Sequence, residues 1–137
     1  MTDPIIVIPC SGIGKAFGTI ARDATYSVVE DLKKGTTETI CLSLLVMGDE
    51  EAGRLVKSHR CIAVDGCPNE CSKKNLVLSG AKLAANFRVV DILRDHRDLK
   101  PSAVTFIDEA GRKLAKILAD KISTRIDELD QEGRVSK

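Results

Sequence analysis

Residues 61–71 read CIAVDGCPNEC, and this stretch decides the fold because a strand, a tight turn and a helix start follow one another in it. The short apolar run CIAV is typical of a strand that is buried on both faces. Asp65 and Gly66 close this strand, and a proline in the first turn indicates a helix from Pro68 to Ala81. Strand, turn and helix in this order predict one unit of a parallel sheet.

Strands and helices continue to alternate on both sides of this stretch. Residues 5–9, IIVIP, form a continuous β-branched run that predicts a second fully buried strand. The further elements that we expect, in chain order, are a helix over 15–34 ended by Gly35, a strand within 39–46 that ends near Cys41, a helix over 48–59, an edge strand over 87–92, and a long helix from 102 or 108 to about Leu129.

The fold class that follows is α/β, with one Rossmann-like three-layer domain over residues 1–137. A chain of 137 residues fits one domain, and no linker divides it. Right-handed crossovers restrict how parallel strands are connected, and we expect about four parallel strands in the order 2-1-3-4, with a long C-terminal helix. This order puts a topological switch point between strands 1 and 3, where open α/β sheets bind ligands.

Four of the five cysteines come after expected strands. Cys10 follows the first strand, Cys41 lies in or just after the second, and Cys67 follows the third, with Cys71 one helical turn further on. Neighbouring strands lie about 4.8 Å apart, so three of these cysteines are expected within roughly 10 Å at the carboxyl edge of the sheet. Positions 67 and 71 would share one face of the expected helix. The sequence therefore predicts one four-cysteine site.

Four thiolates suit two kinds of centre, a tetrahedral zinc ion or an iron–sulfur cluster. The positive ends of the helices after Cys10 and around Cys67 would stabilise thiolates there. Cys61 lies inside the expected strand, where we expect a small buried side chain and no ligand. Asp65 ends that strand, and we expect it to accept backbone hydrogen bonds in the turn, with the orientation of ligands as the alternative.

These residues also resemble a known family. The stretches PCSG at 9–12, Cys41-Leu42 and VDGCPNEC at 64–71 are similar to the DGC-domain family, small bacterial and archaeal proteins that are described as zinc-binding and named for a central Asp-Gly-Cys. The resemblance covers most of residues 5–92. It implies that the four cysteines named above are the chelating set, that Cys61 is outside it, and that zinc is the metal. It implies no particular reaction.

Composition excludes several other classes of function. The net charge is +1, and three Phe, one Tyr and no Trp leave little aromatic surface, so we expect no nucleic-acid partner. No apolar run reaches the roughly 18 residues that cross a bilayer, and the start MTDPIIVIPC does not have the pattern of a signal peptide. We therefore expect no membrane partner and a cytoplasmic location.

Residues 12–18, GIGKAFG, follow a strand and open a helix, as a phosphate-binding loop does. The spacing departs from both common phosphate-binding patterns, so we expect no nucleotide cofactor. Glycines there would instead let the turn pass close to the cysteines.

The function that we expect is a cytoplasmic metal-binding protein with a four-cysteine site and an accessory role in handling metal or sulfur. Its partners would be a metal ion and a protein of a larger assembly. We expect the apolar stripe from Ile107 to Leu129 to pack in the core, with contact between two copies as the weaker alternative. The main alternative is a redox protein that holds an iron–sulfur cluster or uses Cys67 and Cys71 as a dithiol. A third is an enzyme that keeps one position on zinc open, and the sequence does not decide whether the protein is an enzyme.

Overall fold

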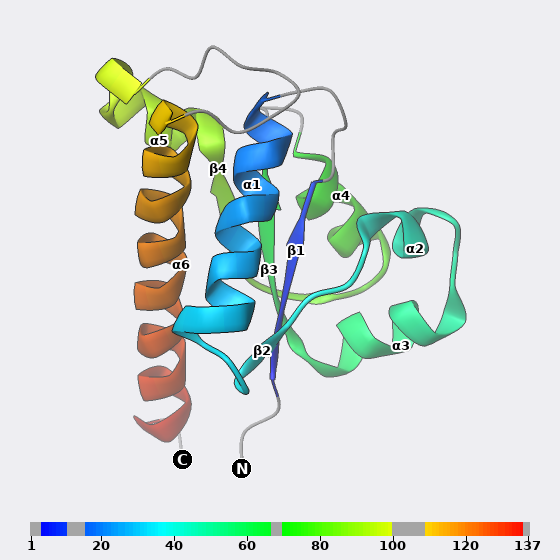
Figure 1. Cartoon of the computed structure of the whole chain (residues 1–137). Coiled ribbons are helices and arrows are strands. Elements are labelled where there is room, and N and C mark those ends of the chain that lie inside the picture. The colour runs from blue at the N-terminus through cyan, green and yellow to red at the C-terminus, as the bar shows by residue number, and fades with distance from the viewer. Residues whose placement is uncertain (1–3, 11–15, 67–69, 100–108, 136–137) are drawn as a thin grey trace.

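The computed structural model describes residues 4–10, 16–66, 70–99 and 109–135. Within them, four parallel strands form one sheet in the order β2-β1-β3-β4 (Figure 1). The α/β class and the strand order are those expected from the sequence, and β1 and β3 lie side by side at the switch point. The strands are β1 (Ile5–Pro9), β2 (Thr37–Glu38), β3 (Arg60–Asp65) and β4 (Lys82–Arg88).

Helices cover both faces of the sheet and give two hydrophobic cores (Figure 1). On one face, α1, α5 and α6 pack against Val7 and Val64; on the other, α2, α3 and α4 pack against Ile8 and Ala63. Side chains of a strand alternate between the two faces, so β1 and β3 supply both cores. The helical elements are α1 (Ala16–Ser27), the π-helical turn η1 (Val28–Leu32), α2 (Leu42–Val46), α3 (Glu50–Ser58), α4 (Cys71–Leu78), α5 (Val89–Asp95), the 3-10 turn η2 (Arg97–Leu99) and α6 (Glu109–Val135).

The two long helices bury the apolar stripes that their sequences predict. The stripe of α1 and η1 is buried at Ile20, Ala21, Ala24 and Val28, and that of α6 at Leu114, Leu118, Ile122, Ile126 and Leu129. Leu32, at the end of η1, is 46% exposed, and Gly35 then turns the chain with a φ of 86°. The α6 helix runs past the expected end, as far as Val135, and Arg125 pairs there with Glu128 and Glu132. The side chains of Phe17 and Ile107 lie outside the described residues.

The position predicted for the second strand, within 39–46, is wrong. The strand β2 has only two residues, which pair with Ile5 and Ile6, and the apolar letters after Cys41 belong to helix α2. Leu42 and Leu45, three positions apart, are both buried against the sheet. In a short helix both side chains lie on the same side, which faces the sheet. In a strand, two residues three positions apart would point to opposite faces of the sheet.

The expected fourth strand over 87–92 is displaced by several residues. The strand β4 pairs with β3 from Lys82 to Arg88, and the chain turns into α5 where β3 ends. Val89 and Ile92 are then buried as one side of a helix. The strand lies at the edge of the described sheet, as expected.

None of the described helices is long and apolar enough to span a membrane.

Candidate cysteine site

Cys10 lies at the carboxyl edge of the sheet, directly after β1. Its backbone N–H donates a 2.8 Å hydrogen bond to the carbonyl oxygen of Val64, which continues the pairing of β1 with β3. Its side chain is half-buried. The register of two central strands therefore fixes the backbone of Cys10 beside the end of β3.

Asp65, the last residue of β3, fastens the start of α4 to this edge. Its side chain is fully buried, with Oδ1 accepting a 2.7 Å bond from the N–H of Ser72 and Oδ2 accepting a 3.2 Å bond from the N–H of Lys73. The Ser72 hydroxyl, also buried, donates a 2.7 Å bond to the carbonyl oxygen of Ile8 in β1. Asp65 and Ser72 together tie the first turn of α4 to both central strands; we call this pair the Asp65–Ser72 clamp.

Burial raises the pKa of the Asp65 carboxyl above its ordinary value, and the bonds from the N–H groups of Ser72 and Lys73 oppose this rise. An unpaired buried carboxylate would be costly, but N–H groups in the first turn of a helix have no partner within the helix. Each group satisfies the other, so Asp65 performs the work of a helix cap from a neighbouring strand. Asp65 accepts backbone hydrogen bonds, as expected. The donors, however, lie in α4 and not in the turn after β3.

The start predicted for the helix after β3, at Pro68, is wrong. Helix α4 begins at Cys71, and Glu70 before it has left-handed backbone angles, with φ 54° and ψ 47°. The helix begins here because the clamp holds the N–H groups of its second and third residues. Cys67 lies outside the described residues, and the turn at Glu70 rules out the idea that positions 67 and 71 share a face of one continuous helix.

Cys71 is the first residue of α4 and its side chain is exposed. The side-chain amide of Asn75 donates a 2.8 Å bond to the Cys71 carbonyl oxygen, and the ammonium of Lys73 lies 3.6 Å from a carboxylate oxygen of Glu70. The Glu70 carboxylate also accepts a bond from the Asn86 side chain in β4.

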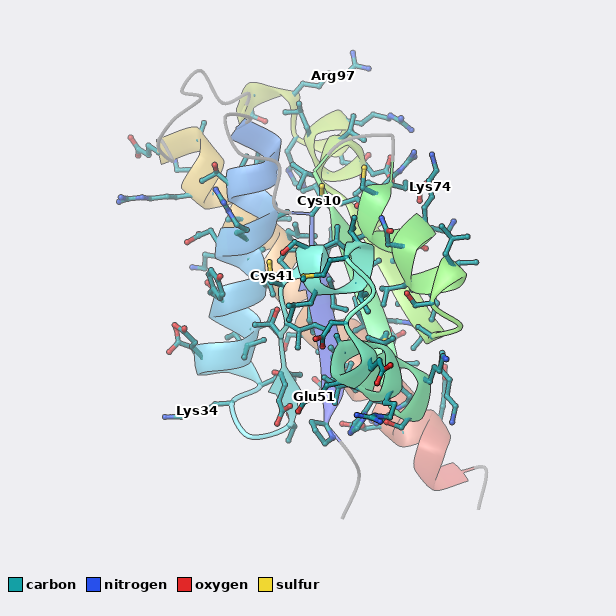
Figure 2. The ribbon with its side chains drawn as sticks, turned by 90° about the vertical axis from the view of Figure 1, so that its right-hand side faces the viewer. Cys10, Lys34, Cys41, Glu51, Lys74 and Arg97 are labelled. Atoms are coloured by element: carbon teal, nitrogen blue, oxygen red, sulfur yellow. The ribbon has the colours of Figure 1, made fainter. Side chains whose placement is uncertain are left out.

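Cys41 precedes α2 and is exposed (Figure 2). Its sulfur lies 2.8 Å from the hydroxyl oxygen of Ser43. Hydrogen bonds from the Ser43 hydroxyl, and then from the backbone of Ser43 and Leu44, lower the pKa of the Cys41 thiol. This thiol therefore forms a thiolate, the species that binds metals and attacks disulfides, more readily than an ordinary cysteine. The sequence analysis missed Ser43, because it expected a strand at these residues and not the start of a helix.

Cys61 has the opposite surroundings. Its side chain is fully buried in the second core, and its sulfur lies 3.4 Å from the carbonyl oxygens of Val56 and His59. Burial raises the pKa of the Cys61 thiol to about 11. Cys61 therefore packs as a small core residue, as the sequence reasoning expected.

The described residues alone do not assemble a metal centre. Among them, no three side chains of the types His, Cys, Asp or Glu are grouped closely enough to hold an ion. Cys10, Cys41 and Cys71 are among the residues that this covers, whereas Cys67 is not. Convergence of all four sulfurs at one point stays a prediction.

Comparison with protein families gives a match that covers most of the chain. The model of the DGC domain matches residues 6–117. The chain belongs to the DGC domain family. The matched region includes all four predicted ligands and extends into α6, beyond the residues that carried the resemblance. Comparison with curated proteins gave no match, and comparison with solved structures gave none either.

Proposed function

We propose that this DGC domain protein binds a thiophilic metal through the thiolates of Cys10, Cys41, Cys67 and Cys71. Zinc is the expected ion, with handling of metal or sulfur for another protein as the role. The proposed compartment is the cytoplasm, where thiols stay reduced. When bound, zinc would supply a stable tetrahedral centre for four thiolates.

The observation that carries the proposal is the contrast in burial among the cysteines. Free cysteine is among the most buried residue types, and Cys61 follows this rule. Cys10 is only half-buried, and Cys41 and Cys71 are exposed, so core packing does not explain these three. They are also members of the set that the family resemblance implies.

The type of donor fits a thiophilic metal. The lowered pKa of the Cys41 thiol favours its thiolate, and ligation requires the deprotonated form. The Asp65–Ser72 clamp would position the backbone of Cys71 next to that of Cys10. Because no group of three ligands is assembled among the described residues, the proposal requires Cys67 and a movement of exposed thiols towards Cys10 when the metal binds.

Elemental analysis of protein purified without oxygen tests the proposal, with a visible spectrum of the same sample. We expect about one zinc per chain and no colour. Single Cys→Ser variants at positions 10, 41, 67 and 71 should each lose most of the metal. Cys61→Ser is the matched control and should keep it. Folded protein without metal, or metal that survives all four substitutions, would refute the proposal.

A redox function is the second candidate, favoured by the exposed Cys71 at a helix start and by the lowered pKa of Cys41. It takes two forms, an iron–sulfur cluster or a dithiol of Cys67 and Cys71. The same experiment separates them from zinc. A brown sample that contains iron and sulfide would indicate the cluster, whereas metal-free protein with a reducible 67–71 disulfide would indicate the dithiol.

A further inference from the structure

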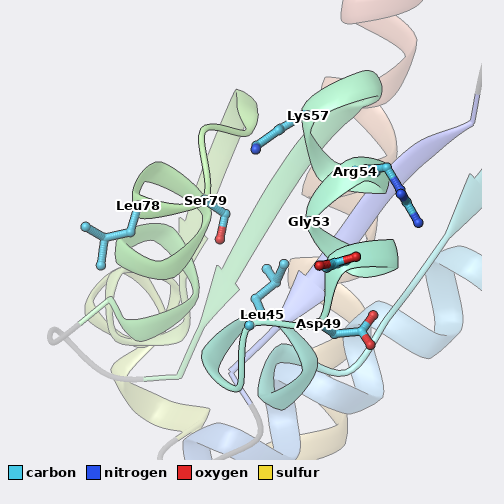
Figure 3. A pocket seen from close by; sticks show the side chains of 9 residues that line it. Leu45, Asp49, Gly53, Arg54, Lys57, Leu78 and Ser79 are labelled. Atoms are coloured by element: carbon cyan, nitrogen blue, oxygen red, sulfur yellow. The ribbon is translucent and has the colours of Figure 1, made fainter.

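A groove lies at the ends of α2 and α4 that are remote from their cysteines. The last turns of these two helices and one side of α3 line a cavity of about 410 Å³ (Figure 3). Leu45 of α2, part of the second core, lies at its base, with Lys57 of α3 and Ser79 after α4 on its sides. We call it the α2–α3–α4 groove. Helix α4 has eight residues and so spans about 12 Å between Cys71 and this groove.

Exposed apolar side chains gather at the same two helix ends. Leu78 is 85% exposed, Met47 74%, Val46 64% and Val77 59%. They are four of the six large apolar side chains that are exposed in the described part of the chain, the other two being Tyr26 and Leu32 on the opposite layer. Single exposed apolar residues are ordinary, but a concentration beside a groove is typical of an interaction site.

A glycine inside α3 keeps one wall of the groove open. A β-carbon at Gly53 would meet nothing within 4 Å, and glycine inside a helix is less stable than alanine. Gly53 therefore has neither a steric nor a backbone reason to be glycine. Gly48, which also lines the groove, has one, because its φ of 81° is left-handed. The missing side chain at position 53 leaves room for an occupant.

The charges on the walls limit what the occupant is. Arg54 and Lys57 line the groove, and neither side chain has an ion pair or a hydrogen bond within the described residues. The stem of Lys57 lies over Gly80, where a β-carbon would come within 3.5 Å of Cε. Of the two acids in the lining, Asp49 already accepts a 2.9 Å bond from the N–H of Ala52, and Glu50 stands in the first turn of α3. Figure 3 shows the side chain of Lys57 directed toward α4 over the groove, so this cation is available to a carboxylate from outside.

We propose that the α2–α3–α4 groove docks a segment of a partner protein that carries a bulky apolar side chain with a carboxylate beside it. The apolar side chain enters over Leu45 and the open wall at Gly53, beside Leu78. The carboxylate pairs with Lys57. This docking does not depend on metal binding, but it places the partner on the helix that begins with Cys71.

A library of random dodecapeptides displayed on phage and selected on the immobilised full-length protein tests the proposal. Selected peptides should share a bulky apolar residue within a few positions of Asp or Glu. By fluorescence anisotropy of a selected peptide, Leu78→Asp and Gly53→Leu should each weaken binding about tenfold. Lys57→Glu should weaken it about fivefold and reduce its dependence on salt.

Leu32→Asp is the matched control, since Leu32 is also an exposed leucine but lies outside the groove, and it should leave affinity unchanged. Gly53→Leu decides the matter should Leu78→Asp fail to fold, because a β-carbon at position 53 meets nothing within 4 Å. Metal content should be the same in Gly53→Leu and the unmodified protein, which separates this test from that of the cysteine site. Failure to enrich apolar–acidic peptides, binding that survives Gly53→Leu, or a dimer that Leu78→Asp dissociates would overturn the proposal.

Discussion

The two ends of β3 differ in the hydrogen-bond partners that they offer to a buried polar side chain. Near its start, Cys61 is buried against the second core, where burial raises the pKa of the thiol to about 11. At its end, Asp65 is equally buried, yet its two carboxylate oxygens accept hydrogen bonds from the N–H groups of Ser72 and Lys73. The carboxyl end of a parallel strand faces a helix start, which supplies donors, and these donors are why the buried carboxylate of Asp65 is tolerated.

The same comparison separates a cysteine that packs in the core from cysteines that are accessible at the surface. Cys61 lies where the sheet is closed by packing, whereas Cys10 and Cys71 lie where helix starts and strand ends leave side chains accessible. The Cys61 thiol is buried and stays protonated, whereas Cys10 and Cys71 reach the surface, as the proposed metal binding requires. Each of the following experiments tests this difference between the two ends of the sheet.

The largest effect is expected from Asp65→Ala. Loss of both acceptors leaves the N–H groups of Ser72 and Lys73 buried or partly buried without a partner, which should lower the free energy of unfolding by about 3 kcal/mol. Urea denaturation followed by circular dichroism measures it. Asp65→Asn, which keeps one acceptor oxygen, should lose less than Asp65→Ala. Equal stability of Asp65→Ala and the unmodified protein would show that the clamp does not hold α4.

Removal of metal from reduced protein is expected to have the next largest effect. The two cores contain apolar residues from both faces of the sheet, so the α/β circular dichroism should survive chelation. A metal held at a hundred times its Kd adds about 2.7 kcal/mol, so the melting temperature should fall by roughly 10 °C. A random-coil spectrum after chelation would mean that the open end of the sheet, and not the cores, sustains the fold.

Cys61→Ser should cost about 1 kcal/mol in the free energy of unfolding, because a hydroxyl is more expensive to bury than a thiol. The carbonyl oxygens of Val56 and His59 near the sulfur would accept its hydrogen bond and limit the loss. Metal content should not change. A Cys61→Ser variant that folds but loses its metal would place Cys61 among the ligands and remove the contrast between the two ends.

The smallest effect is the pH dependence contributed by Asp65. Its pKa is raised in the folded state, so the folded protein binds the proton more tightly than the unfolded chain does. This contribution to stability is fully present below the unfolded carboxyl pKa of about 3.9 and is lost as pH rises through the higher folded value. Measured by urea unfolding at a series of pH values, the stability of the unmodified protein relative to Asp65→Asn should increase on acidification. A decrease would mean that the hydrogen bonds from Ser72 and Lys73 outweigh burial.

Much of the fold was predictable because long apolar patterns report which face is buried. The runs at 5–9 and 61–66 identified β1 and β3, and the helical stripes identified α1 and α6. Short elements were not predictable in the same way. The letters ICLSLLV fit a strand or a helix equally well, and KLAANFR in β4 has little of the β-branched character that marks a strand.

The sequence predicted where the candidate cysteines lie in the fold better than it predicted their local geometry. The positions of Cys10 and Cys71 at one end of the sheet followed from the strand order, and the exclusion of Cys61 followed from its place inside a strand. The left-handed Glu70 and the start of α4 at Cys71 did not follow, because Pro68 suggested an earlier helix start. Ser43 was missed, since its effect on Cys41 depends on a contact that no periodic pattern reports.

The sequence by itself determined the α/β class, the strand order 2-1-3-4 and the family, because these depend on the alternation of apolar runs and on the Asp-Gly-Cys motif. Only the tertiary structure decided where β4 ends, where α4 begins and which thiols are accessible. These depend on partners far along the chain. The end of β3 sets the end of β4, the carboxylate of Asp65 and the carbonyl of Ile8 set the first turn of α4, and the packing of α3 against the sheet buries Cys61.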